Sequence, residues 1–207
     1  MPELRIQTVL CGLIGENAYI VRAEGRPDCV VVDPGDDYTA IRRALGARSL
    51  GAILLTHGHF DHILSAARLA GECAAPVYVA QADLEMLNDP SLNGYAGLMG
   101  RDRMPSPPIE ALSVPDALSV AGLDFEILRT PGHSRGSVCY YLPGEGALFS
   151  GDTLFEAGYG RLDLHGGSAD DMRASLLRLF ELPGEVRVYP GHGGATTIAR
   201  ERARYRL

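Results

Sequence analysis

Five short apolar segments of this chain, each about as long as a β-strand, run almost directly into a histidine or an aspartate. The junctions are Val32-Asp33, Leu55-Thr56-His57, Arg129 to His133, Ser150-Gly151-Asp152 and Tyr189 to His192. Strand ends that share one edge of a sheet lie close together, so polar side chains from distant segments can converge there. The pattern therefore constrains the chain to a sheet whose edge carries a polar site.

The other periodic segments indicate a layered α/β fold. Further strand-sized runs bounded by Gly, Pro or Asp are Leu4–Leu10, Ala18–Arg22, Val77–Ala80, Asp124–Leu128 and Ser137–Leu142. Apolar residues spaced three and four apart predict helices over Tyr38–Leu45, Asp61–Ala70, Ala82–Leu87 and Ser168–Phe180. Strands and helices mixed along one unbroken chain predict α/β layers. The Pro- and Gly-rich stretch 88–108 is one long irregular segment, and such loops often cover a site.

Length and charge limit the function. A chain of 207 residues suits a single domain with its own core. The net charge is −7 and no residue is lysine. An acidic chain without a basic block lacks the phosphate grip of nucleic-acid binders, so we expect a small-molecule substrate. The absence of lysine excludes Schiff-base chemistry.

The cysteines and the N-terminus point to a reduced compartment. Cys11, Cys29, Cys73 and Cys139 are scattered and form no Cys-x-x-Cys pair, so neither a disulfide scaffold nor a zinc knuckle is expected. The first residues lack the apolar stretch of a signal peptide, and no apolar run is long enough to span a bilayer. We therefore predict a cytoplasmic protein that does not bind membranes; its oligomeric state is left open.

Three of the six histidines lie in the hexapeptide His57-Gly58-His59-Phe60-Asp61-His62, directly after an apolar strand. In extended backbone, residues two apart point the same way, so His57, His59 and Asp61 can face one centre. His62 would follow on the first helical turn and reach a neighbouring centre. Imidazole and carboxylate are ligands that zinc, iron or manganese accept. This spacing predicts a metal site.

Three more residues occupy equivalent positions after strands. His133 and His192 each stand in a Gly-His step, and Asp152 stands in a Gly-Asp step. Together with the hexapeptide they account for five of the six histidines. His165 is left over, and we expect it in a loop near the mouth of the site.

Several motifs resemble the metallo-β-lactamase superfamily, with the spacing of its hydroxyacylglutathione hydrolase (glyoxalase II-like) branch and of small single-domain bacterial members in particular. They are Thr56 to His62, Gly132-His133-Ser134, Gly151 to Phe155, Gly191-His192-Gly193, Val31 to Gly35, Gly160 to Asp163 and Thr197 to Arg202. The resemblance spans Asn17 to about Arg202.

The resemblance implies a four-layer αββα sandwich with a dinuclear site at one edge. It implies that the first of two divalent metal ions, with zinc expected and iron or manganese as alternatives, is held by His57, His59 and His133. The second would be held by Asp61, His62 and His192, with Asp152 bridging both. Asp33 would orient the histidine loop from behind the ligands. Residues 1–207 would form a single domain without the C-terminal helical domain that binds glutathione in two-domain glyoxalases.

The resemblance also implies a reaction. Two metal ions can lower the pKa of a shared water, and the bridging hydroxide, held by Asp61 and Asp152, would attack the acyl carbon of a thioester. A thiolate leaves without strong acid catalysis because its conjugate acid has a pKa near 8.5. Tyr159 and Arg161 are candidate substrate contacts. Without lysines to bind its carboxylate, glutathione as the carrier thiol remains open.

Three alternatives remain. Persulfide dioxygenases share the motif set, including a step like Gly160–Asp163, and use one iron. Lactonases and phosphodiesterases can use the same dinuclear ligands. Finally, Gly132 to Gly136 matches the serine nucleophile elbow, with Ser134, Asp152 and His192 in the matching order. That elbow requires a helix after the serine, whereas Ser137–Leu142 alternates like a strand.

The C-terminal arginines have two interpretations. Arg200, Arg202, Arg204 and Arg206 could form an anion-binding surface, or they could be the solvated face of a terminal helix. Only pairs four apart share a helix face, which favours the solvated helix.

Overall fold

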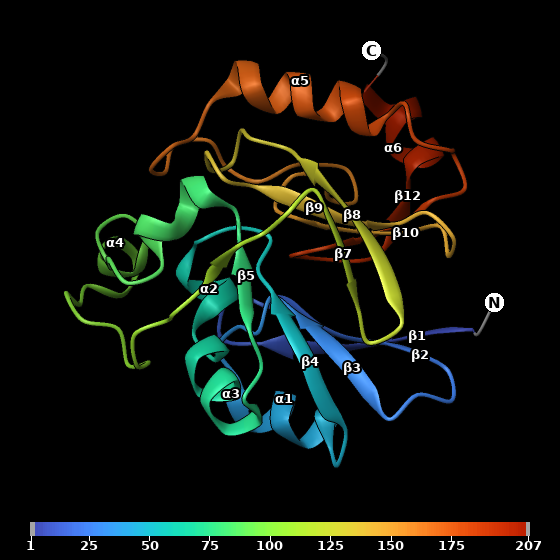
Figure 1. Ribbon diagram of the computed structural model, residues 1–207. Coiled ribbons are helices and arrows are strands. Elements are labelled where there is room, and N and C mark those ends of the chain that lie inside the picture. The colour runs from blue at the N-terminus through green and yellow to red at the C-terminus, as the bar shows by residue number, and fades with distance from the viewer. Residues whose placement is uncertain (1–2, 206–207) are drawn as a thin grey trace.

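A computed structural model describes residues 3–205, and its strands form two six-stranded sheets that divide the chain in sequence order (Figure 1). Sheet 1 contains, in spatial order, β1 (Leu4–Cys11), β2 (Glu16–Ala23), β3 (Asp28–Val32), β4 (Ser49–Leu54), β5 (Val77–Val79) and β6 (Leu112–Ser113). Sheet 2 contains β12 (Thr196–Thr197), β11 (Arg187–Pro190), β10 (Ala147–Gly151), β9 (Val138–Leu142), β8 (Leu123–Arg129) and β7 (Ala117–Val120).

Helices cover the outer face of each sheet. In Figure 1, α1 (Tyr38–Leu45) and α3 (Ala66–Cys73) lie below sheet 1, and α5 (Ala169–Leu179) lies above sheet 2 with α6 (Ile198–Tyr205) at its end. Three short elements are found at one side: α2 (Phe60–Ile63), the 3₁₀ helix η1 (Gln81–Met86) and α4 (Tyr95–Met99). The predicted αββα sandwich is confirmed.

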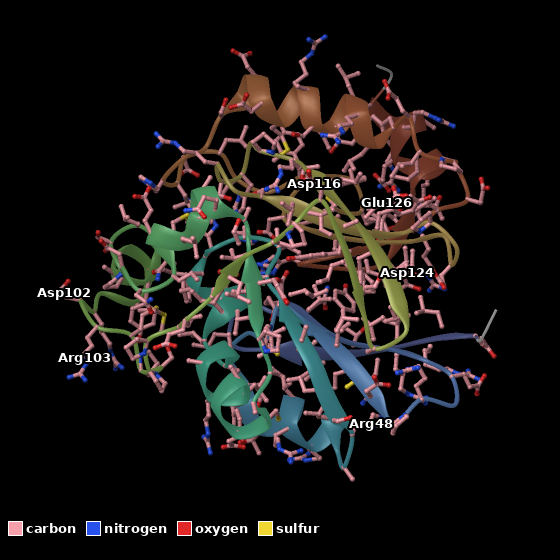
Figure 2. All side chains as sticks on the ribbon, in the orientation of Figure 1. Arg48, Asp102, Arg103, Asp116, Asp124 and Glu126 are labelled. Carbon is pink, nitrogen blue, oxygen red and sulfur yellow. The ribbon has the colours of Figure 1, made fainter. Side chains whose placement is uncertain are left out.

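The four layers create three interfaces, and each has its own apolar cluster. Strand β3 shows why: Val30 and Val32 pack between the sheets, whereas Val31 faces Ile41 of α1. Successive strand residues point to opposite faces, so a strand covered on both sides must be apolar throughout. In β8, next to the edge strand β7, the alternation returns, because Asp124 and Glu126 are exposed beside buried neighbours (Figure 2).

The longest helix, α5, begins and ends almost where the sequence predicts. The Ser168 side chain accepts a hydrogen bond from the backbone N–H of Asp171 at 3.3 Å, which caps the helix. Asp170 and Asp171 lie in the first turn, where the helix dipole favours negative charge. Met172 and Leu176 are buried in the interface between α5 and sheet 2. The predicted helix Tyr38–Leu45 coincides with α1.

Two predicted helices differ from the structure. The segment Asp61–Ala70 is not one helix, because the Ser65 backbone N–H donates to the Pro34 carbonyl and its hydroxyl donates to Gly35, 2.5 Å away. These bonds replace helical ones and separate α2 from α3. The segment Ala82–Leu87 is the 3₁₀ helix η1, in which the Asp83 N–H bonds three residues back to Ala80.

The stretch 88–108 is irregular except for α4. At the other end of the chain, α6 carries Arg200, Arg202 and Arg204, and Arg206 lies outside the described residues. No helix between residues 3 and 205 has both the length and the apolar character that crossing a bilayer requires.

Candidate metal centre

Strand direction explains why the predicted site residues meet. Strands β3 and β4 are parallel, so Asp33 and Thr56-His57 emerge at the same edge of sheet 1. Strands β10 and β11 are also parallel, which places Asp152 and His192 together at the facing edge of sheet 2. The Asn17 backbone N–H donates to the Gly191 carbonyl at 2.7 Å and ties the two edges together.

All seven predicted ligands lie in two adjoining groups. The ring nitrogens of His57, His59 and His133 form one group, and Asp61, His62 and His192 form the other, with the donor atoms of each group within 4.8 Å of one another. Asp152 adjoins both groups: its Oδ2 lies 3.4 Å from Nε2 of His133, and its Oδ1 lies 3.3 Å from Nε2 of His62.

The donor atoms suit metal ions. Nε2 of His57, His59 and His62 and Oδ1 of Asp152 are buried without a hydrogen-bond partner. Unpaired buried polar atoms are costly, and native proteins rarely leave several side by side. The carboxylate of Asp33 is buried in the same cluster, and a buried negative charge is stabilised by positive charge nearby. Borderline divalent ions prefer this imidazole and carboxylate set, so the residues fit the predicted metals.

Electrostatics divide the histidines into two kinds. Burial lowers the pKa of His57 well below its ordinary value, and the neighbouring imidazoles His62 and His133 lower it further. Burial, with His133 next, lowers the pKa of His59 to about 3. Burial also disfavours charge on His62, but the carboxylates of Asp61 and Asp152 outweigh it and raise its pKa well above the ordinary value. His57 and His59 are therefore neutral at pH 7, which is the form that binds metal.

Asp33 organises the histidine loop from behind the cluster. Its Oδ1 accepts the backbone N–H of Thr56 at 2.7 Å, and its Oδ2 accepts the Thr56 hydroxyl at 2.6 Å. Nδ1 of His62 lies 3.0 Å from the same Oδ2. Asp33 has a positive φ of 47°, a strained conformation that directs its carboxylate toward this loop. These contacts place the Asp33 carboxylate behind the histidine loop, where the resemblance implies an orienting residue.

Asp83 performs a similar task that the sequence did not reveal. Its buried carboxylate accepts the Gly58 N–H at 2.9 Å, the Gly136 N–H at 2.7 Å and the Ser134 hydroxyl at 2.6 Å. Gly58 belongs to the hexapeptide, and Ser134 and Gly136 follow His133. One carboxylate therefore joins the two loops that carry the first ligand group. An acid within an amphipathic segment ordinarily lies on the solvent face, so no sequence signal identifies it.

A second unpredicted acid, Glu16, lies at the start of β2. The side chain is 1% exposed, neither carboxylate oxygen has a hydrogen-bond partner, and Oε1 lies 3.9 Å from Nδ1 of His62. Burial raises its pKa well above the ordinary value, and the negative charge of Asp33 adds to that effect. Acids at strand starts are usually solvated, so no sequence signal indicates that this one is buried.

The cluster opens into a cleft of about 600 Å³. Arg161 lines it, but its Nε and Nη2 each lie 2.7 Å from a carboxylate oxygen of Asp163. Tyr159 does not line this cleft; its ring packs near Tyr205 of α6. His165 occupies a turn, 3.6 Å from Glu85.

Residues 132–136 do not form a serine nucleophile elbow. Residues after Ser134 lead into strand β9 instead of a helix, and the Ser134 hydroxyl is buried and hydrogen-bonded to Asp83. A nucleophile on a sharp strand-to-helix turn would need the opposite arrangement. Ser134 therefore has a structural role.

Comparison with known proteins agrees with this geometry. The sequence profile described as the Metallo-beta-lactamase superfamily matches residues 11–192. A probable metallo-hydrolase of Bacillus subtilis, YqgX, is 36% identical over 193 residues, covering 92% of this chain and 90% of that protein. The hydroxyacylglutathione hydrolase of Aeromonas hydrophila is 37% identical over 177 residues, but the match covers 59% of that longer protein and 84% of this chain.

Solved structures give the same result. The crystal structure of the BLEG-1 B3 metallo-beta-lactamase superposes with a TM-score of 0.89 at 37% identity, covering 96% of this chain and 97% of that one. TTHA1623, in a di-iron-bound form, has a TM-score of 0.82 at 37% identity with the same coverage. ETHE1 from Myxococcus xanthus has a TM-score of 0.74 at 27% identity and covers 96% of this chain and 81% of that one.

Proposed function

The chain belongs to the metallo-β-lactamase superfamily, and from this premise we propose that it is a dinuclear metallohydrolase that cleaves a thioester of the hydroxyacylglutathione type. The observation that carries the proposal is the carboxylate of Asp152, whose two oxygens lie against His62 on one side and His133 on the other. A carboxylate shared by two groups of donors is the arrangement that two-metal hydrolases require.

The proposed ligands are the seven predicted residues, with His57, His59 and His133 for the first metal ion and Asp61, His62 and His192 for the second. Two divalent ions held there would lower the pKa of a water molecule and polarise a carbonyl oxygen. The surrounding side chains fix the geometry. Asp33 orients His62, and Asp83 holds the His57–His59 loop against the His133 loop.

The cleft favours a leaving group that needs no acid. Among the described residues that line it, Arg161 is the one titratable side chain outside the proposed ligands, and guanidinium does not donate a proton at pH 7. A thiol has a pKa near 8.5, so a thiolate can depart unaided, whereas an alkoxide from an ordinary ester cannot. The likeness to hydroxyacylglutathione hydrolase supports the same choice.

We propose zinc as the metal, with iron and manganese as the alternatives to test; the di-iron-bound relative supports iron. We further propose that residues 1–207 act as one domain in the cytoplasm on a small molecule, without nucleic acid or membrane as a partner.

The test is metal analysis of protein purified without added metal, followed by assay with S-lactoylglutathione. We expect two metal ions per chain, turnover that a chelator abolishes, and loss of both the second ion and turnover in Asp152→Asn. The matched control is Asp102→Asn, at an exposed position on the 88–108 loop (Figure 2). Inhibition by a serine-directed phosphonate but not by a chelator would refute the proposal.

A persulfide dioxygenase with one iron is the second candidate, because the likeness to ETHE1 is compatible with it. The complete second group, Asp61, His62 and His192, supports the hydrolase instead. One iron per chain together with oxygen uptake on a persulfide substrate would establish the dioxygenase and exclude the hydrolase.

A further inference from the structure

Four apolar side chains are unusually exposed on two neighbouring segments. Leu13 and Ile14, in the turn between β1 and β2, are 95% and 47% exposed. Leu98 and Met99 of α4 are 57% and 39% exposed. Both pairs line one small apolar hollow together with Tyr95, so the turn and α4 adjoin each other. Apolar groups gathered at the surface indicate a binding site more often than chance exposure.

This apolar patch continues into the cleft of the metal centre. Ile14, Phe60 and Leu98 line both the hollow and the cleft. Phe155 and Leu164 line the cleft as well. The same cleft is also lined by proposed metal ligands, among them Asp61 and His192. A molecule whose reacting carbon lies at the ligands can therefore extend along an apolar wall formed by Ile14, Leu98 and Phe155.

The wall offers little to a charged group. Asn93 lines the cleft, but its amide is occupied: Nδ2 donates to the Met86 carbonyl, and Oδ1 accepts the Tyr95 N–H, both at 3.0 Å. Arg161 is the one arginine among the described lining residues, and Asp163 binds it in a two-point ion pair. A carboxylate lying along the wall would lose water without gaining a partner, which is unfavourable.

We propose that this wall, formed by Ile14, Leu98 and Phe155, binds an apolar acyl chain, and that the preferred substrates are thioesters of acyl groups longer than acetyl. The proposal rests on the thioester hydrolase function above. Carrier thiols are polar, so the acyl group is the part of such a substrate that suits an apolar wall. Hydrolysis forms a carbon–oxygen bond to water, breaks the carbon–sulfur bond, and releases a carboxylate, a thiol and one proton.

The test compares the acetyl, butanoyl and hexanoyl thioesters of one neutral thiol, N-acetylcysteamine. Each methylene that becomes buried is expected to raise kcat/KM by about fourfold. The hexanoyl ester should therefore exceed the butanoyl ester by roughly 10- to 20-fold. A chain-length dependence below twofold would overturn the proposal while leaving the hydrolase intact.

Variants assign the effect to the wall. Leu98→Ser is expected to reduce the hexanoyl-to-acetyl ratio of kcat/KM at least fivefold. The matched control is Leu112→Ser on β6, because Leu112 is 55% exposed and does not line the cleft. An equal loss in both variants, or none in Leu98→Ser, would contradict the assignment.

A binding measurement separates failure of the wall from failure of the hydrolase. The metal-free protein is titrated calorimetrically with S-ethyl and S-hexyl thioethers of N-acetylcysteamine, which cannot be hydrolysed. Tighter binding of the hexyl compound, weakened in Leu98→Ser, would support the wall even if no thioester is turned over, in which case the thioesterase proposal fails. Equal affinity for both thioethers would refute the wall.

Discussion

The carboxylate of Asp83 joins the two loops that carry the first ligand group, and Asp83→Asn tests that role. Asparagine keeps the shape but offers one acceptor oxygen. The three donors approach both oxygens, since Gly58 and Ser134 contact Oδ2 and Gly136 contacts Oδ1. In either orientation the new NH₂ group faces a backbone N–H. At least one buried donor then loses its partner.

The magnitude follows from these contacts. A buried N–H without a partner costs about 1–3 kcal/mol, and the remaining bonds weaken because they no longer involve a charge. We expect Asp83→Asn to lower the free energy of unfolding of the metal-free protein by roughly 2–4 kcal/mol. Because Asp83 fixes the loops of His57, His59 and His133, metal affinity should fall about 10- to 100-fold.

Urea unfolding of the metal-free protein measures the first quantity, and competition with a chromophoric chelator measures the second. Asp102→Asn is the control, since Asp102 lies at the outer end of the 88–108 loop (Figure 2) and should change neither. If Asp83→Asn alters unfolding by less than about 0.5 kcal/mol and leaves metal affinity within twofold, Asp83 does not join the loops as we argue.

Three further predictions concern protonation, backbone and thiols. Because the pKa of His59 is about 3 in the fold and about 6.5 when unfolded, the unfolded chain binds the extra proton between these values. The free energy of unfolding of the metal-free protein, relative to that of the His59→Asn variant, should therefore rise with pH in that window, by at most about 1.4 kcal/mol per pH unit. A difference in urea titrations that does not depend on pH would contradict this. Gly132→Ala should destabilise by at least about 2 kcal/mol, because Gly132 has a φ of +145° and a Cβ would lie 2.5 Å from Cα of Met172; calorimetric melting tests it. Iodoacetamide at pH 8 should modify only the partly exposed Cys73 in the folded protein, because burial raises the pKa of the other thiols to between about 11 and 12. The protected residues are Cys11, Cys29 and Cys139. More than one modified site in the mass spectrum would contradict this prediction.

Local spacing predicts much of this molecule. The alternation of β3 and the junctions after the strands depend on residues that are neighbours in sequence, so the layers and the convergence of the seven residues could be inferred. The two short helices replaced the predicted Asp61–Ala70 helix because Ser65 bonds to Pro34 and Gly35, about thirty positions away. Periodicity contains no information about such a contact.

The supporting acids were missed for the same reason. Asp83 meets Ser134 across 51 positions, and Glu16 meets His62 across the sheet edge. From its neighbours in sequence alone, each of these acids would be expected on the solvent-exposed side of its segment. The apolar wall was equally hidden, since Ile14, Leu98 and Phe155 belong to separate segments and line one cleft only in the folded chain.

The sequential division into two sheets has a consequence for assembly. Strands β1–β6 form one sheet and β7–β12 the other, so a single passage of the chain, between Ser113 and Ala117, connects them. Four of the proposed ligands come from the first half and three from the second. Metal ions bound there would connect the two halves, each of which could complete the hydrogen bonds of its own sheet. Metal binding and association of the two halves would then be thermodynamically coupled. A chain cleaved between Ser113 and Ala117 would therefore reassemble more tightly in the presence of metal.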